Sequence, residues 1–291
     1  MWKPKNQIIE PPITFITIDL LMKLKFPFMA AIICTITMSL PLMSCGNDED
    51  DEPEVPAKPS ASIGLMSIAG HGQTLFAFEY DASGRMTKLS APAYQYTIEI
   101  SYKPLKLTLV DEVEGAVMTM TDISTNSDGY ITKTSFNEDG EGCPTTMSYD
   151  SDGHLTSITS DGEVSHFSWT NGNLMKVAGA DGGIATFDYS SLDNTAGVFS
   201  PLWSGIMGML WMTDLFGTAP ANFPSSINSD GDIALFSYTL NANGTINTEQ
   251  FTYGGVTATF DYYYTGDRAV EDGAAEVLPT VFKHNIFRRS H

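Results

Sequence analysis

The sequence predicts an all-β protein, an antiparallel meander of roughly 12–16 strands that forms a strongly curved or barrel-like sheet. Turn-forming glycines at positions 129, 140, 153, 162, 172 and 182 are separated by 11, 13, 9, 10 and 10 residues. This spacing is typical of consecutive β-hairpins. The apolar residues between these turns show no helical period, so we expect strands there.

A repeated unit, aromatic-Asp-x-x-Gly-x-apolar, marks the hairpins. It is intact at residues 80–84 and 149–153. The aspartate bonds nearby backbone amides and the glycine accepts a positive φ, so the unit predicts a type I turn with a glycine bulge. The glycines of these two copies and of three looser copies are Gly84, Gly129, Gly153, Gly172 and Gly244.

Residues 200–217 depart from the β pattern. Ser200 fits a helix N-cap, Pro201 fits the first helical position, and Gly217 fits the end of a helix. Apolar side chains surround nearly the whole axis, so this helix, near 201–216, should be buried. A second transmembrane span is the alternative, although the stretch is shorter than the about 20 residues that a span needs. The side chains expected in the core are Trp203, Ile206, Leu210 and Trp211.

The first part of the chain has the layout of a secretory signal. Lys23 and Lys25 precede an uncharged apolar run over 26–42, and Ser44 precedes Cys45. A basic start, an apolar run and a small residue before the cut predict a signal peptide over 22–44. The junction resembles a bacterial lipoprotein lipobox, which implies that Cys45 becomes a diacylated N-terminus and anchors the protein to the outer membrane.

A run of acidic residues follows Cys45 directly. Six of the seven residues from 48 to 54 are acidic. Such a run repels itself and buries little, so we expect a flexible tether over 45–62. The run also resembles the export signal that Bacteroidetes lipoproteins use to reach the cell surface, with a periplasmic location as the alternative. The residues assigned to this signal are Asp48, Glu49, Asp50, Asp51 and Glu52.

The remaining boundaries follow from composition. Residues 1–21 fit neither a signal nor a domain and are expected to be an over-extended start, because Met22 begins the signal layout. The hairpin domain is expected over 63–267, with the helical insertion at 200–217. Residues 268–291 have little pattern and are expected to be a weakly ordered tail.

Charge excludes one class of partner. The chain has 15 basic and 35 acidic residues, a formal net charge of −20. Removing residues 1–44, which contain four lysines and two acidic residues, leaves −22. A surface of this sign repels phosphates, so we expect no nucleic-acid binding.

The sequence offers no catalytic, cofactor or metal motif. It contains no nucleophile elbow, phosphate-binding loop or His-Glu-x-x-His. If residues 161–162 form a two-residue turn, His154 faces Trp169, whereas His166 faces Ser157 on the other side of the sheet. The two histidines then cannot share a metal. We therefore expect no catalytic residue, cofactor or metal.

One aromatic residue is a candidate ligand contact. In the run 262–264 of three tyrosines, strand alternation places Tyr263 on the face opposite its two neighbours. We expect an exposed aromatic there.

The intact Tyr-Asp-x-x-Gly units at 80–84 and 149–153 resemble YD repeats. Together with the lipobox and acidic tether, the chain resembles a Bacteroidetes surface lipoprotein family of unknown function with a porin-like fold. The resemblance covers about residues 63–264 and implies a barrel-like sheet.

These features favour a non-enzymatic cell-surface lipoprotein, a β scaffold for adhesion or for binding a macromolecule or glycan. Its expected partners are the outer membrane, through the lipid, and an extracellular glycan or protein. One alternative is a glycan-active hydrolase that uses an Asp/Glu pair. Another is a carrier of an apolar ligand held near the Met-rich segment 206–212.

Overall fold

The computed structural model describes residues 64–92, 95–112, 115, 117–138, 141–203 and 206–265. The expectations for residues 1–62 and 268–291, which include lipidation of Cys45 and the export signal from Asp48 to Glu52, lie outside the described residues.

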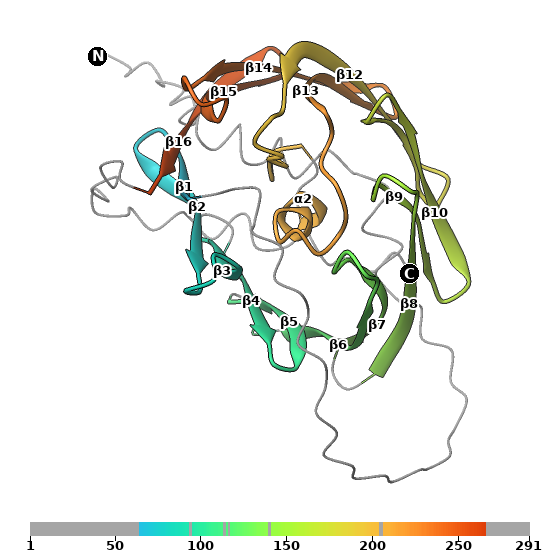
Figure 1. Ribbon diagram of the computed structural model, residues 1–291. Coiled ribbons are helices and arrows are strands. Elements are labelled where there is room, and N and C mark those ends of the chain that lie inside the picture. Colours follow the sequence, from blue (N-terminus) through green and yellow to red (C-terminus); the bar gives the residue numbers. More distant parts are fainter. Residues whose placement is uncertain are drawn as a thin grey trace, which may run out of the picture.

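In this part of the chain, sixteen antiparallel strands form one closed barrel (Figure 1). The first eight are β1 (Leu65–Gly70), β2 (Gln73–Tyr80), β3 (Met86–Ala91), β4 (Tyr96–Tyr102), β5 (Leu105–Asp111), β6 (Val117–Thr125), β7 (Ile131–Glu138) and β8 (Glu141–Tyr149). The others are β9 (Leu155–Ser160), β10 (Glu163–Thr170), β11 (Asn173–Ala178), β12 (Ile184–Asp193), β13 (Asn222–Ser229), β14 (Asp232–Leu240), β15 (Ile246–Tyr253) and β16 (Val256–Tyr264). Each strand pairs with its neighbours in sequence, and β1 pairs with β16, which closes the barrel. The predicted all-β meander is confirmed.

Alternation along the strands separates an apolar interior from a polar outer face. On β10, Ser165 and Phe167 are buried, whereas His166 and Ser168 are exposed. The same alternation places many large side chains inside, and Phe251 is fully buried. This pattern is that of a sheet with one face on the core and the other in water.

The predicted register around residues 161–162 is confirmed. Glu163 pairs with Ser160, and His166 pairs with Ser157. His154 is buried and stacks on Trp169. The two histidines therefore lie on opposite faces of the sheet.

The long connection between β12 and β13 enters the barrel and contains α2 (Ile206–Trp211), which Figure 1 shows inside the ring of strands. The predicted helix over 201–216 was therefore too long. Residues 201–203 form a turn, in which the Trp203 amide donates to the Ser200 carbonyl.

The helix also ends earlier than predicted. The Thr213 hydroxyl donates to the Leu210 carbonyl at 2.6 Å, and the first left-handed residue after the helix is Asp214, with φ of 60°, rather than Gly217. A side-chain bond to a backbone carbonyl of the last turn competes with further helix. Leu210 and Trp211 within α2 are at most 7% exposed, and burial extends beyond the helix, because Trp203 before it and Met212 and Phe216 after it are at most 3% exposed. The side chain of Ile206 lies outside what the structure describes.

None of the helical structure in the described ranges has the length and apolar composition that a bilayer-crossing helix requires.

Candidate functional site

The repeat turns gather at one end of the barrel, called here the repeat mouth. It carries the turns at 81–85, 126–130, 150–154, 171–172 and 241–245, whereas turns such as 71–72 and 161–162 lie at the other end. The five glycines assigned to turns, Gly84, Gly129, Gly153, Gly172 and Gly244, all have positive φ, between 74° and 85°.

The aspartate of each intact unit organises its turn as the motif requires. Asp150 Oδ1 accepts hydrogen bonds from the amides of Asp152, at 3.0 Å, and His154, at 2.9 Å. Asp81 accepts from Ser83 and Arg85 in the same way. Partial burial opposes ionisation of Asp81 and Asp150, but these bonds and the basic partner outweigh it and lower the pKa of both carboxyls. The carboxyl groups of Asp81 and Asp150 therefore serve to stabilise the turns.

The residues after three of the turn glycines, Gly84, Gly129 and Gly153, each contact an aromatic ring on a later strand. Arg85 lies 4.3 Å from the centroid of the Tyr102 ring, and His154 stacks on Trp169 with centroids 4.4 Å apart. Tyr130 packs on Tyr149 at 5.3 Å. These contacts join successive hairpins around the mouth and give the repeat its structural role.

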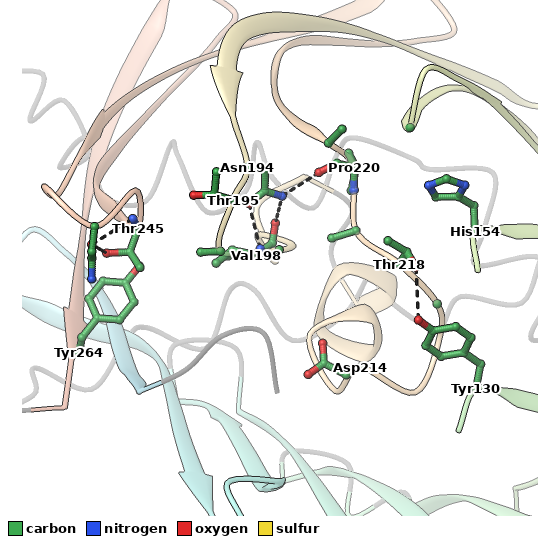
Figure 2. Close-up of a pocket in the computed structure, with 17 residues that line it drawn as sticks. Tyr130, His154, Asn194, Thr195, Val198, Asp214, Thr218, Pro220, Thr245 and Tyr264 are labelled. Atoms are coloured by element: carbon green, nitrogen blue, oxygen red, sulfur yellow. Dashed lines mark hydrogen bonds between the residues drawn. The ribbon is translucent and has the colours of Figure 1, made fainter. Parts of the chain in front are cut away.

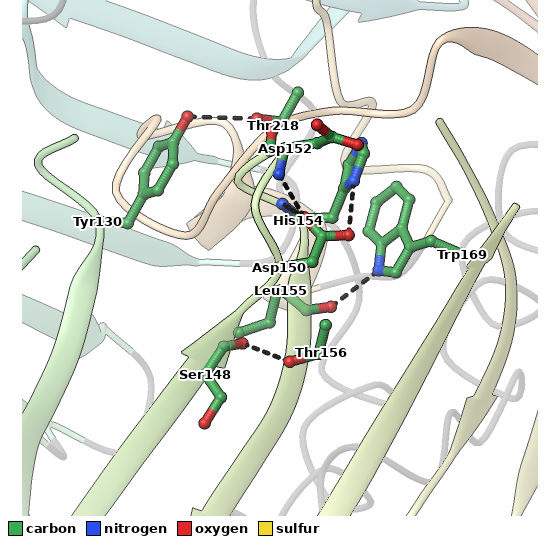
Figure 3. Close-up of polar contacts among 9 residues, drawn as sticks. All are labelled: Tyr130, Ser148, Asp150, Asp152, His154, Leu155, Thr156, Trp169 and Thr218. Carbon is green, nitrogen blue, oxygen red and sulfur yellow. Dashed lines mark hydrogen bonds and ion pairs between the residues drawn. The ribbon is translucent and has the colours of Figure 1, made fainter. Parts of the chain in front are cut away.

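Five aromatic residues at the mouth ends of their strands also bond the preceding strand. Four of them are tyrosines whose hydroxyls donate to backbone carbonyls: Tyr80 to Leu65, Tyr102 to Met86, Tyr149 to Ile131 and Tyr189 to Leu174. The Trp169 indole does the same to the Leu155 carbonyl, at 2.8 Å (Figure 3). Burial raises the pKa of Tyr102 to about 12 and also raises the pKa of Tyr149 and Tyr189, so these three hydroxyls stay protonated donors at neutral pH.

Residues 194–221, the insertion, enter and leave the barrel at the repeat mouth. Buried Asn194 holds its two limbs together, because its side-chain amide donates to the carbonyls of Val198, at 2.8 Å, and Pro220, at 2.9 Å. The backbone amide of Asn194 also donates to the Ala221 carbonyl at 2.8 Å. These hydrogen bonds join the start and the end of the insertion at the repeat mouth.

The returning limb is bonded in succession to the first residue of β7 and to two repeat turns. The Leu215 carbonyl accepts from the Ile131 amide, the Thr218 amide donates to Gly153, and the Ala221 amide donates to Gly172, each at 2.9 Å. The Thr218 hydroxyl additionally contacts the Tyr130 hydroxyl at 3.2 Å, as Figure 3 shows. The limb therefore follows the rim in steps of three residues.

The turn glycines make this approach possible. A Cβ on Gly153 would lie 2.8 Å from the Tyr130 ring and 2.9 Å from the Thr218 hydroxyl. A Cβ on Gly244 would lie 2.5 Å from Thr195 Oγ1, whereas a Cβ on Gly84 would meet nothing within 4 Å. Gly153 and Gly244 thus serve both the turn and the insertion.

Farther inside, the insertion contacts a buried carboxylate on the barrel wall. Glu249, on β15, is fully buried and accepts hydrogen bonds from the Ser200 hydroxyl and the Trp203 indole, each at 2.9 Å. The Tyr262 hydroxyl on β16 also donates to it. Sequence reasoning missed this cluster. A signal was present, because Glu249 is two residues from Phe251 and so falls on the apolar face of its strand.

Above the insertion lies an open cavity of about 640 Å³ (Figure 2). Tyr130 and His154 form one side of it, Thr245 and Tyr264 the other, and the limbs of the insertion run between them. Its described lining consists of Tyr130, His154, Gly172, Asn194, Thr195, Ala196, Gly197, Val198, Asp214, Gly217, Thr218, Ala219, Pro220, Ala221, Asn243, Thr245 and Tyr264. The cavity therefore combines small apolar surfaces with hydroxyls, amides and one imidazole.

The described lining contains one carboxylate, that of Asp214, and no lysine or arginine. No cluster of three metal-ligating side chains occurs among the residues that the structure describes. The buried Met212 does not line this cavity. The arrangement can therefore offer hydrogen bonds to a polar ligand.

Tyr263 lies away from the cavity. Its neighbours in sequence, Tyr262 and Tyr264, both pack on the core, whereas Tyr263 is half-exposed and pairs with Ser67 of β1. The structure thus places Tyr263 on the outer face and does not bring it to the candidate site.

No protein-family profile and no curated protein matches the chain. Among solved structures, the chain is similar to a porin-like protein from Bacteroides uniformis ATCC 8492, with 19% identity and a TM-score of 0.49, over 65% of this chain and 89% of that one. It is also similar to a porin-like protein from Bacteroides vulgatus ATCC 8482, with 11% identity and a TM-score of 0.43, over 69% of this chain and 98% of that one. Membership of a lipoprotein family with YD-type repeats stays a prediction.

Proposed function

We propose that the protein is a non-enzymatic scaffold, anchored to the cell surface by lipid, that binds an uncharged extracellular glycan at the repeat mouth. The observation that carries the proposal is the open cavity of about 640 Å³, floored by the chain's own insertion. Buried side chains of the insertion occupy the barrel interior, and the mouth offers a ligand a concave surface.

The lining supports a ligand rich in hydroxyl groups. Thr195, Thr218, Thr245 and Asn243 offer groups that can both donate and accept hydrogen bonds. The described lining provides no cationic side chain of Lys or Arg, and the chain has a net charge of −20, so phosphate and carboxylate ligands are disfavoured.

The outer wall supports attachment by an anchor. A barrel that spans a membrane presents an apolar band to lipid and a polar lumen. On the described strands the alternation is the reverse, as on β10, where Phe167 is buried while His166 and Ser168 are exposed. Cys45 and the acidic residues 48–52 supply the anchor and export signal that the sequence predicts.

Binding fits the geometry better than two-carboxylate hydrolysis. Glycoside hydrolysis normally requires two carboxyl groups about 5–10 Å apart across the ligand. Asp214 is the single carboxylate of the described lining, and Asp150, on the rim, is engaged with the His154 side chain at 3.0 Å.

The binding proposal is tested with immobilised neutral polysaccharides and the purified chain. Ala221 is exposed and lines the cavity, so Ala221→Trp should fill it and reduce retention at least about tenfold. Thr259→Trp, on the exposed outer face of β16, is the matched control and should retain binding. Unfolding temperatures establish that both variants fold. Equal retention by Ala221→Trp, no retention by the unmodified chain, or turnover of a retained polysaccharide would each refute the proposal.

Surface display is tested separately. Replacing Asp48, Glu49, Asp50, Asp51 and Glu52 with Ala should keep lipidation but protect the domain from protease added to whole cells. Unchanged protease exposure would contradict the export role of this run.

A further inference from the structure

The insertion meets the barrel wall at one ionisable group that the cavity does not use. Glu249 is 0% exposed, and its two oxygens accept hydrogen bonds from Ser200, Trp203 and Tyr262. Two of these donors belong to the insertion and one to β16. The Ser200 and Tyr262 hydroxyls also contact each other at 2.9 Å, which makes one connected network.

Among the described residues, no cation balances the charge of this network. The described residues place no lysine or arginine within ion-pair distance of Glu249. The titratable groups that face it are Tyr262 on β16 and Tyr238 on β14, and burial raises the pKa of both phenols. Ser200 and Trp203, from the insertion, do not titrate. An ionised Glu249 therefore depends on hydrogen bonds alone to offset its burial.

The balance between burial and hydrogen bonding sets the protonation of this group. Burial raises the pKa of Glu249 to about 7, although the bonds from Tyr262, Ser200 and Trp203 act in the opposite direction. A folded-state pKa above that of the unfolded chain stabilises the fold at low pH. This contribution is fully present below the unfolded pKa of Glu, near 4.5, and is lost as pH rises through about 7.

We propose that Glu249 is a pH-sensitive latch, which holds the insertion against the barrel wall when it is neutral and loosens it when its proton is lost to solvent. Val198, which lines the cavity, lies only two residues from Ser200. Loosening the turn at 200–203 therefore frees one wall of the cavity. The latch is independent of any ligand, because it is built from contacts within the chain.

The test measures amide hydrogen exchange of residues 198–203 in the purified full chain at pH 5 and pH 8, after correction for intrinsic exchange rates. The open fraction of this segment should rise about tenfold or more between pH 5 and pH 8. The reason is that the pKa of Glu249 is raised only in the closed state, so loss of its proton favours the open state. Glu249→Gln cannot ionise and should show less than about a twofold change. Glu163→Gln, at an exposed position of β10, is the matched control and should behave like the unmodified chain.

A second variant keeps the latch testable if Glu249→Gln does not fold. Tyr262→Phe retains Glu249 but removes one donor to its charged form, so the change between pH 5 and pH 8 should become larger. The latch is wrong if Glu249→Gln keeps the full pH dependence, or if Tyr262→Phe shows an equal or smaller one.

Discussion

The amide of Thr218 donates a 2.9 Å hydrogen bond to the carbonyl oxygen of Gly153. Thr218 belongs to the insertion, and Gly153 is the turn glycine of an intact repeat unit. The same limb bonds the turn that contains Gly172. The hairpin repeats thus build the barrel wall and also hold the segment that fills it.

Replacing Gly153 with Ala should destabilise the protein more than the same change at Gly84. Both glycines have a φ near 80°, so each alanine costs about 1 kcal/mol of backbone strain. Only a Cβ at Gly153 also collides with Tyr130 and Thr218, which should add about 2 kcal/mol. Denaturant unfolding of the two variants measures the difference, and equal losses of stability would contradict the dual role of Gly153.

The aromatic hydroxyls at the repeat mouth should contribute to stability. Tyr149→Phe removes a 2.7 Å bond to the Ile131 carbonyl and should lower the free energy of unfolding by about 1 kcal/mol. Tyr263→Phe, on the outer face, is the control and should have little effect. A similar loss of unfolding free energy in both variants would show that the bond to Ile131 does not stabilise the fold.

The turn acids should support the fold at neutral pH and cease to do so in acid. The pKa values of Asp81 and Asp150 are lowered in the folded protein, so their contribution is present above the unfolded pKa of Asp and is lost as pH falls through the folded value. Asp150→Asn should therefore lower the unfolding midpoint at pH 7 and have less effect near pH 2. Asp152→Asn is the comparison within the same turn and should change little at either pH. If Asp150→Asn lowered the unfolding midpoint equally at pH 7 and near pH 2, this role of the turn acids would be contradicted.

Sequence patterns predicted features that depend on neighbouring residues. Alternation placed His154 and His166 on opposite faces, and the turn chemistry of the repeat applied at residues 80–84 and 149–153. The predicted helix extended too far at its C-terminal end, because Thr213 and Asp214 end it through local bonds that helix propensity does not reveal. Glu249 was missed because its partners Ser200 and Trp203 lie 49 and 46 residues away. Such pairings are fixed only when the barrel closes around the insertion.

A charge inside the barrel should unfold the protein, whereas the same charge outside should be tolerated. Leu210 on α2 is 7% exposed, and Leu235 on β14 is 50% exposed. Leu210→Asp buries a carboxylate without a partner and should abolish the cooperative unfolding transition, while Leu235→Asp should keep it. A folded Leu210→Asp variant that only loses a binding partner would show that α2 is an exposed docking helix.

The insertion is a fixed part of the barrel interior, and the repeat turns hold it at the rim. Amide hydrogen exchange on the full chain tests this arrangement at the amides of Thr218 and Ala221, which donate to Gly153 and Gly172. We predict protection comparable to that of the Ile131 amide, which donates from β7 to Leu215 of the insertion. Exchange at the rate of an unstructured chain at Thr218 and Ala221, in a barrel whose strands remain protected, would show that the repeat turns do not hold the insertion in place.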